Sequence, residues 1–297
     1  MSISFFNNVK KAMTNLNPAE VRDEAHRRIR IGLFAQSDAA YRQMEDFFHP
    51  AAVSPQRREE LAGIIERSSF VSGRLGPQYD LEIYSPDTRV PPHGFPFYAN
   101  NPERTVREIL NAHPELGLPL ARNIYPFRAP FVDQMIRKVS RENALFSLAT
   151  ALPDIVPFIT LPWAVGEFAS DTAVLTANQV RLAFLLAAAS NCDVGYREQK
   201  GQIISILLGA FGWRAIAREL VGKIPFGAGL IPKAAVAYAG TKVAGLSLEK
   251  YYRVGYGLSQ QERKTAYQAA LERGKTVAGS LLSGLKRRQM AGTIAGH

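Results

Sequence analysis

The chain is poor in the residues that usually mark a catalytic or metal site. It has one cysteine, Cys192, and five histidines scattered along 297 residues. A single cysteine excludes an internal disulfide and indicates a reducing compartment. No two histidines stand three or four residues apart, so we expect neither a metal nor a cofactor. No Gly-x-Ser-x-Gly motif is present, and no basic neighbour favours the thiolate of Cys192, so the sequence does not argue for an enzyme.

The parts of a usual phosphate-binding loop are also missing. Residues 29–48 favour a strand, a loop and a helix, with Ser37 or Asp38 as the N-cap. The segment after Gly32 reads LFAQSDAA and lacks the glycines, the terminal lysine and the magnesium-binding hydroxyl of such loops. The later segment Gly222–Gly229 has glycines and a lysine in the wrong order, and it predicts a turn between apolar helices. We therefore do not expect GTP binding through the usual sequence motifs.

Clean membrane-spanning runs are absent as well, although residues 144–248 hold four long apolar stretches. A span needs about 20 predominantly apolar residues, and these stretches are interrupted by prolines or charges, or are too short. The pattern leaves an inserted hairpin bundle and a compact soluble bundle equally open. Small side chains close to one helical face favour tight helix packing: Ala237, Gly240 and Ala244.

Charged residues inside or beside this apolar block are costly unless they are paired. We predict a buried charge network in which carboxylates of one helix meet arginines of another. Its members are Asp154, Glu167, Asp171, Arg181 and Arg214. The alternative is that the same charges line a small-molecule or catalytic site in a soluble helical protein.

Positive charge collects at the two ends of the chain. Residues 1–30 hold six Lys/Arg against three acids, and residues 249–297 hold nine against three, within a net charge of +10. Such ends suit an anionic lipid surface, and no nucleic-acid-binding module is recognisable, so nucleic acid is not an expected partner. The lipid-contact candidates are Lys10, Lys11, Lys286, Arg287 and Arg288. The N-terminus lacks the order of a secretory signal, and its helical stripe fits either a membrane surface or packing on its own domain: Ile3, Phe6, Val9, Met13 and Leu16.

The predicted fold is mainly α, with a C-terminal bundle of apolar helical hairpins preceded by a small α/β unit. We expect strands at 29–34 and 79–85, and irregular chain at 85–96 and 113–130. The predicted helices follow Ser37 and run over Pro55–Arg67, Pro102–Ala112, Pro130–Ala149 and, from the capping pair Ser259 and Glu262, Gln260 to about Arg273. Five segments result: a basic amphipathic arm (1–28), the α/β unit (29–92), a helical connector (93–143), the apolar helical domain (144–258) and a basic helical tail (259–297).

Four segments in order resemble the YcjF-like family, a bacterial domain of unknown function often fused or adjacent to small GTPase domains. They read RENALFSLATALPDIVPF, LPWAVGEFASDTAVLTANQVRLAFLLAAA, GWRAIARELVGKIPFGAGLIPKAAVAYAGT and YYRVGYGLS, and the resemblance covers about residues 122–259. It implies a helical, membrane-associated domain that acts beside a GTPase, with no catalytic residues to transfer. The chain departs from the fused members because it lacks an intact GTPase domain, and residues 29–85 stand where a shrunken, nucleotide-free remnant of one would be.

The expected function is thus a non-enzymatic accessory or adaptor protein linked to a GTPase system, on the cytoplasmic side of the cytoplasmic membrane. A soluble cytoplasmic protein is the alternative. The expected partners are an anionic membrane surface and a separate small GTPase, with a homo-oligomer as a further option.

Overall fold

The computed structural model describes residues 13, 16–48, 63–68, 78–150, 171–207 and 229–295. Contacts divide the chain into two compact units. The α/β unit comprises Glu20–Asp133 and Ala188–Asp193, and the helical unit comprises Met1–Ala19, Gln134–Ala187 and Val194–His297. The fold is mainly α with a small parallel sheet, which confirms the predicted fold class.

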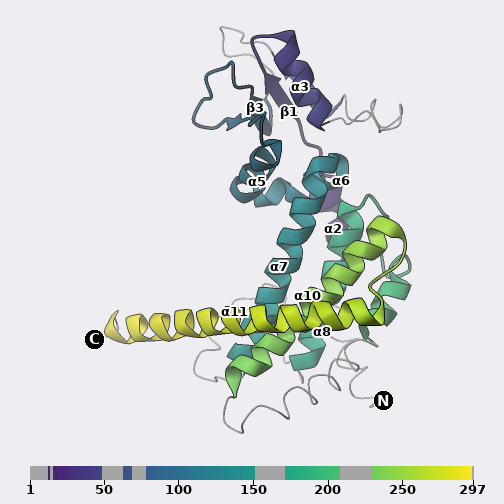
Figure 1. Cartoon of the computed structure of the whole chain (residues 1–297), viewed down its shortest axis with the longest axis vertical. Helices are drawn as coiled ribbons and strands as arrows, with labels where there is room; N and C mark the ends of the chain where they lie inside the picture. Colours follow the sequence, from purple (N-terminus) through teal and green to yellow (C-terminus); the bar gives the residue numbers. More distant parts are fainter. Residues whose placement is uncertain are drawn as a thin grey trace. The chain divides into compact units, whose positions relative to one another are not determined.

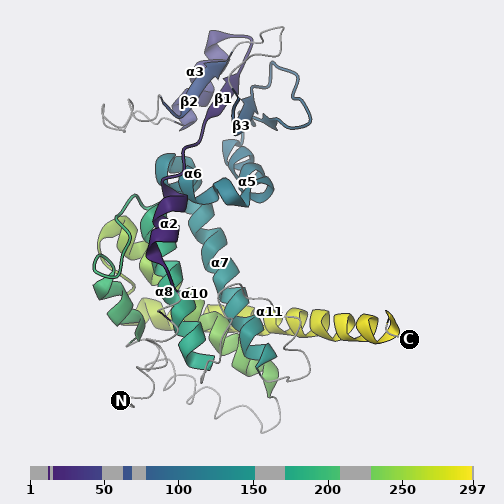
Figure 2. The ribbon, with the colours of Figure 1, turned by 180° about the vertical axis from the view of Figure 1, so that it is seen from behind.

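The sheet has four parallel strands in the order β2-β1-β3-β4 (Figures 1 and 2). The strands are β1 (Ile31–Phe34), β2 (Ile65–Ser68), β3 (Leu81–Tyr84) and the two-residue β4 (Phe95–Pro96). Ile31 of β1 pairs with Ile65 on one side and with Leu81 on the other. All four residues of β1 are buried, as expected of a central strand that is covered on both faces.

Helices complete the α/β unit, and aromatic side chains fill its core. Its helices are α2 (Pro18–Ala25), α3 (Asp38–Phe48), α5 (Pro102–Ala112), the short 3-10 helix η1 (Pro114–Leu116), α6 (Gly117–Asn123) and the start of α7 (Tyr125–Ala149). Phe48 of α3 stacks on Phe127 of α7 with ring centroids 6.0 Å apart, and both rings are at most 1% exposed. α3 thereby closes over the sheet and onto the first turns of α7.

Two predictions for this unit are wrong and one is incomplete. The helix predicted over Pro55–Arg67 is wrong at its end, because residues 65–67 belong to β2 and their pairing with β1 outweighs the helical pattern there; residues 55–62 lie outside the described residues. The segment predicted as irregular before Pro130 is helical, since α6 buries Leu118 and Leu120 completely and α7 begins at Tyr125. The proline-rich loop after β3 is irregular as predicted until it ends in β4, an edge position that tolerates Pro96.

The helical unit is built from α7, α8 (Asp171–Ala189), α10 (Leu230–Val254) and α11 (Gln260–Ala295). α10 and α11 form an antiparallel hairpin whose buried side chains include Val243, Tyr267 and Ala270. A Cβ added at Gly274 of α11 would stand 2.9 Å from the carbonyl oxygen of Ala235, so the two helix backbones approach closely there. The last turns of α11 extend away from the other helices of this unit (Figure 1).

Local signals fix the α10–α11 turn. Gly255 ends α10 in the left-handed conformation with φ 87°, and its N–H bonds the Tyr251 carbonyl at 2.8 Å. The Glu262 carboxylate accepts the Ser259 N–H at 2.8 Å, and the Ser259 hydroxyl accepts the Glu262 N–H at 3.3 Å. This reciprocal capping confirms the predicted start at Gln260, although the helix runs on past Arg273 to Ala295. Within the described part of the chain, none of the helices combines the length and the apolarity of a membrane span.

Candidate functional site

The strand order places the natural ligand position of this sheet at the carboxyl ends of β1 and β3. The chain runs from β1 outward to β2 and then returns to β3 on the other side of β1. In open parallel sheets, ligands bind beside such a reversal of strand order. Two loops meet there: residues 35–37 between β1 and α3, and residues 85–94 between β3 and β4.

A carboxylate of the chain itself holds these two loops together. The Asp87 carboxylate accepts the Gln36 N–H at 3.3 Å and the Ser37 hydroxyl at 3.1 Å, both from the first loop. It also accepts the hydroxyls of Thr88, at 2.9 Å, and of Ser85. The hydrogen bond from Ser85 is the main cause that lowers the pKa of Asp87 to about 2, and the other bonds add to it. The carboxyl group is therefore ionised at neutral pH. The position that an anionic ligand would take is therefore occupied by an anion of the protein.

Gly32 leaves room for two aromatic side chains. A Cβ at this residue would lie 2.6 Å from the Tyr79 ring and 2.9 Å from the Phe34 ring. Aromatic side chains thus fill the space that the missing side chain leaves. The loop after Gly32 uses Ser37 as an N-cap, with its oxygen 3.2 Å from the Ala40 N–H, as predicted for α3.

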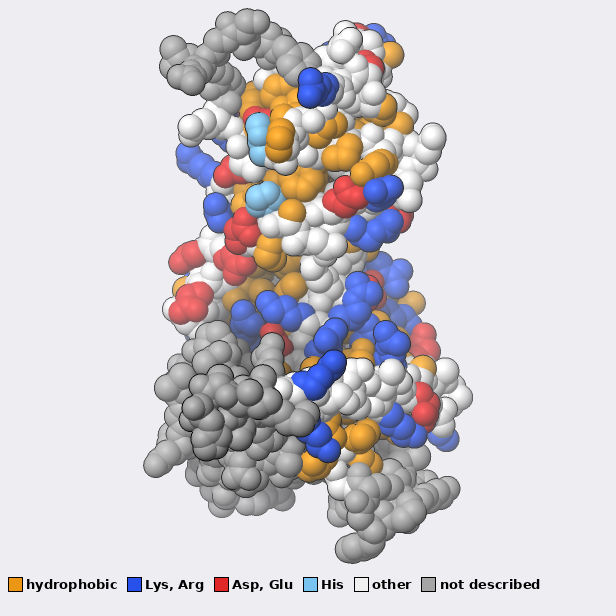
Figure 3. Space-filling model, turned by 90° about the vertical axis from the view of Figure 1, so that its left-hand side faces the viewer, with side chains coloured by type: hydrophobic (Ala, Val, Ile, Leu, Met, Phe, Trp, Pro, Cys, Tyr) orange, Lys and Arg blue, Asp and Glu red, His pale blue; other side chains and the backbone are white. Residues whose placement is uncertain are grey.

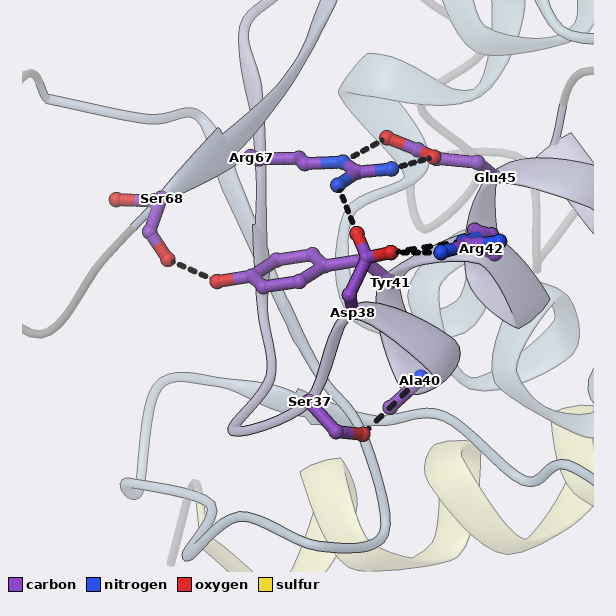
Figure 4. Close-up of polar contacts among 8 residues, drawn as sticks. All are labelled: Ser37, Asp38, Ala40, Tyr41, Arg42, Glu45, Arg67 and Ser68. Atoms are coloured by element: carbon purple, nitrogen blue, oxygen red, sulfur yellow. Dashed lines mark hydrogen bonds and ion pairs between the residues drawn. The ribbon is translucent and has the colours of Figure 1, made fainter.

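A network of ion pairs closes the neighbouring edge between α3 and β2 (Figure 4). Arg67 of β2 donates two hydrogen bonds of 2.6 Å to Glu45 and one of 2.6 Å to Asp38. Asp38 also accepts hydrogen bonds from Arg42, and these bonds are the main reason that the pKa of Asp38 is lowered. The bonds to Glu45 and then to Asp38 raise the pKa of Arg67.

Tyr41 completes this cluster and ties it to the backbone. Its hydroxyl donates to the Ser68 carbonyl at 2.6 Å, and the Arg67 guanidinium lies 5.2 Å from its ring centroid. The Arg67 and Asp38 side chains are 44% and 54% exposed, so solvent screens their attraction and we assign it little stability. The charges of the cluster are turned toward one another, which leaves little electrostatic demand for a ligand.

One acid–base pair on the sheet was not foreseen from the sequence. Glu82 of β3 accepts the Tyr84 hydroxyl at 2.6 Å and lies 2.9 Å from Nε2 of His93. Burial and then this bond raise the pKa of Tyr84. The His93 side chain is 70% exposed, and no nucleophile contacts it among the described residues. An oriented histidine alone does not define a reaction.

The helical unit contains a buried polar layer that joins three helices. Asn143 of α7 donates to the Thr241 hydroxyl of α10 at 2.8 Å and accepts the Asn178 amide of α8 at 2.5 Å. Gln179 donates to the same Thr241 oxygen at 3.3 Å. Asn143, Asn178 and Thr241 are at most 1% exposed. Polar groups of this kind favour one register of the helices, because any other register leaves them without partners.

Only part of the predicted charge network can be located. Asp154, Glu167 and Arg214 lie outside the described residues, as does the side chain of Asp171, the first residue of α8. Arg181 is half-buried, and its charge acts on Glu142 of α7, an acid that the sequence analysis missed. Burial raises the pKa of Glu142, while Lys138 and Arg181 oppose that rise. One oxygen of Glu142 is buried and has no hydrogen-bond partner among the described residues.

The remaining predicted residues are the small helix-packing residues, the lipid-contact candidates and the N-terminal apolar stripe. Gly240 is buried, and Ala237 and Ala244 are half-buried. The close backbone approach on α10 falls at Ala235 instead, and a Cβ added at Gly245 would meet the Ile136 side chain at 2.8 Å. Lys286 and Arg287 are exposed on α11. Lys10 and Lys11 lie outside the described residues, as does the side chain of Arg288. Leu16 is buried, whereas Ile3, Phe6 and Val9 also lie outside the described residues.

The chemistry of these groups is not that of a ready catalytic or metal site. In the ranges that the structure describes, no three His, Cys, Asp or Glu side chains group as metal ligands would. Burial raises the pKa of the Cys192 thiol, which disfavours the reactive thiolate. Compared with known proteins, the chain matches no family model, no curated protein and no solved structure.

Proposed function

We propose that this protein is a non-enzymatic accessory protein of a membrane-linked GTPase system. Its α/β unit acts as a recognition domain that works without a nucleotide, and its helical unit associates with an anionic membrane surface on the cytoplasmic side. The observation that carries the proposal is Asp87, which takes the anion position at the switch point of the sheet through bonds to Gln36 and Ser37. A domain that supplies this anion itself has no need of nucleotide phosphates to order its loops.

Charge supports the membrane part of the proposal. Residues 249–297 carry nine Lys/Arg against three acids, and Lys286 and Arg287 are exposed. Figure 3 shows blue Lys and Arg side chains gathered just below the middle of the face that it draws. Each such charge near an anionic headgroup layer contributes about 1 kcal/mol of attraction.

Nucleotide independence is tested by thermal unfolding of the full-length protein with GTP, GDP or ATP and magnesium. A ligand present at 100 times its Kd stabilises a protein by about 2.7 kcal/mol, which raises the Tm measurably. We expect no rise in Tm with any of the three nucleotides. A concentration-dependent rise with one of them would contradict the proposal.

Membrane association is tested by fractionating cells that express the tagged full-length chain. We expect the protein in the membrane pellet and its release by an alkaline wash. Complete recovery in the supernatant after lysis without detergent would contradict this part of the proposal, whatever the nucleotide experiment gives.

A second function is favoured by one specific observation, the buried Glu142 oxygen close to the charge of Arg181. This second function is that of a soluble helical protein with a small-molecule site among buried charges. Under this alternative, Glu142→Gln abolishes a ligand-induced rise in Tm found with the unaltered protein. If Glu142→Gln changes only the stability, the carboxyl group is structural and the alternative fails.

A further inference from the structure

Exposed apolar side chains gather at the turn between α10 and α11. Tyr251 is 40% exposed, Val254 43% and Tyr256 62%, within six consecutive residues. Large apolar side chains are normally withdrawn from water, and a local group of them marks an interaction site more often than a single one does. We call Tyr251, Val254 and Tyr256, with the adjacent Arg263 and Lys264, the hairpin tip.

The frame beneath these side chains is held by many local bonds. The Ser247 hydroxyl accepts the Leu258 N–H at 3.1 Å, and Lys250 bonds both oxygens of Glu262 at 2.7 and 2.9 Å. Tyr252, next to Tyr251, donates to the Ala183 carbonyl of α8 at 3.4 Å. The exposed side chains are therefore presented by a fixed backbone, which lowers the entropy that docking would cost.

The charge around the tip selects the kind of partner. Its two acids are each engaged by a cation, Glu249 by Arg253 at 2.8 Å and Glu262 by Lys250 at 2.7 Å. Arg263 and Lys264, both exposed, add positive charge that these acids do not balance. The Lys250 ammonium also lies 5.0 Å from the centroid of the Tyr256 ring. The surface thus combines tyrosines, an aliphatic side chain and surplus positive charge.

We infer that the hairpin tip docks into the headgroup layer of an anionic bilayer. This inference rests on the proposed membrane association and names the surface responsible. Tyrosine suits the boundary between headgroups and acyl chains because its ring is apolar and its hydroxyl remains wet. Val254 supplies apolar area that enters the acyl boundary, a contact that a nucleic acid would not reward, while Arg263 and Lys264 meet anionic headgroups.

The test is flotation of the full-length protein with vesicles of phosphatidylcholine, alone or mixed with phosphatidylglycerol. We expect binding to the mixed vesicles, a severalfold loss in the double variant Tyr251→Ala/Tyr256→Ala, and a loss of about fivefold per charge in Arg263→Gln/Lys264→Gln at low salt. The matched control is Tyr125→Ala, since Tyr125 is 65% exposed but lies on α7, away from the turn in sequence. It should bind as the unaltered protein does. All these side chains are exposed, so circular dichroism should report an unchanged fold for each variant.

The outcomes separate the inference from the proposed function. If the unaltered protein binds mixed vesicles and the tip variants bind equally well, the hairpin tip is not the docking surface, while membrane association stands. If Tyr125→Ala reduces binding as much as the tip variants do, the inference also fails. If the unaltered protein floats with neither vesicle, membrane association itself is contradicted.

Discussion

The two units use polar side chains in opposite ways. In the α/β unit, the carboxylates of Asp38, Glu45 and Asp87 lie at the surface and accept hydrogen bonds from donors of the same unit. In the helical unit, Asn143, Asn178 and Thr241 form an uncharged layer in the core, while basic side chains on α11 are exposed. Under the proposed function, the α/β unit fills its own anion position and the helical unit offers its positive charge to the membrane.

The largest effect should come from an ordinary apolar core position in the α/β unit. Leu33 of β1 is completely buried, so Leu33→Ala should lower the free energy of unfolding by about 2–5 kcal/mol through lost burial and the cavity left behind. Urea unfolding measures the change. Ile83→Val, in the neighbouring strand, is the milder control at about 0.5–1.5 kcal/mol. Similar costs for both variants would mean that the sheet core repacks easily.

The polar layer of the helical unit should be nearly as sensitive as an apolar core. Asn143→Ala removes the partner of the Asn178 amide and one donor to Thr241, at about 1–3 kcal/mol for each buried group left unsatisfied. Urea unfolding is again the measurement. Arg141→Ala, at an exposed site on the same helix, should change stability by less than about 0.5 kcal/mol. Equal losses for the two variants would refute the structural role of the layer.

Two glycines of α11 give a matched test of the hairpin. Gly274→Ala places a methyl group against the Ala235 backbone at 2.9 Å, and it should destabilise by about 1–3 kcal/mol. Gly279→Ala meets nothing within 4 Å and should stabilise by up to about 1 kcal/mol through its helix propensity. Thermal unfolding of both variants gives the sign of each change. A stabilising Gly274→Ala would contradict the close approach of α10 and α11.

The smallest effect concerns pH and touches one carboxylate in each unit. The pKa values of Asp87 and Glu262 are both lowered to about 2, mainly by the Ser85 hydroxyl and by Lys250, respectively. Both groups therefore contribute stability that is complete above about pH 4, their pKa region in the unfolded chain, and that is lost as pH falls through about 2. Tm values measured between these limits should fall less steeply for Asp87→Asn and for Glu262→Gln than for the unaltered protein. Parallel curves for all three proteins would contradict the assignment.

Short-range signals predicted much of the fold. The apolar run before Phe34 gave β1, Ser37 gave the start of α3, and Ser259 with Glu262 gave the start of α11, because each depends on residues within a few positions. β2 was missed because its strand state depends on pairing with β1, more than 30 residues earlier in the chain. The continuation of α11 past Arg273 was missed because it depends on distant packing: Leu285 lies in a cluster with Ala144 and Tyr238.

The candidate sites were harder to predict for the same reason. Asp87 follows a predicted strand in a Ser-Pro-Asp-Thr turn, but nothing in the sequence shows that it bonds Gln36 about 50 residues away. Asn143 and Asn178 are 35 residues apart, and no local pattern shows that they bond across α7 and α8. The lack of a phosphate-loop motif after Gly32, by contrast, can be read from the local sequence.

The Asn143 layer also limits how the helical unit can move. Sliding α7 by a single turn, about 5.4 Å, would break the hydrogen bonds of Asn143 to Thr241 and to Asn178 together. Each polar group would then be buried without a hydrogen-bond partner, which is costly in free energy. Ratchet-like shifts between α7, α8 and α10 are thereby penalised at every step. These three helices should therefore move together rather than slide past one another.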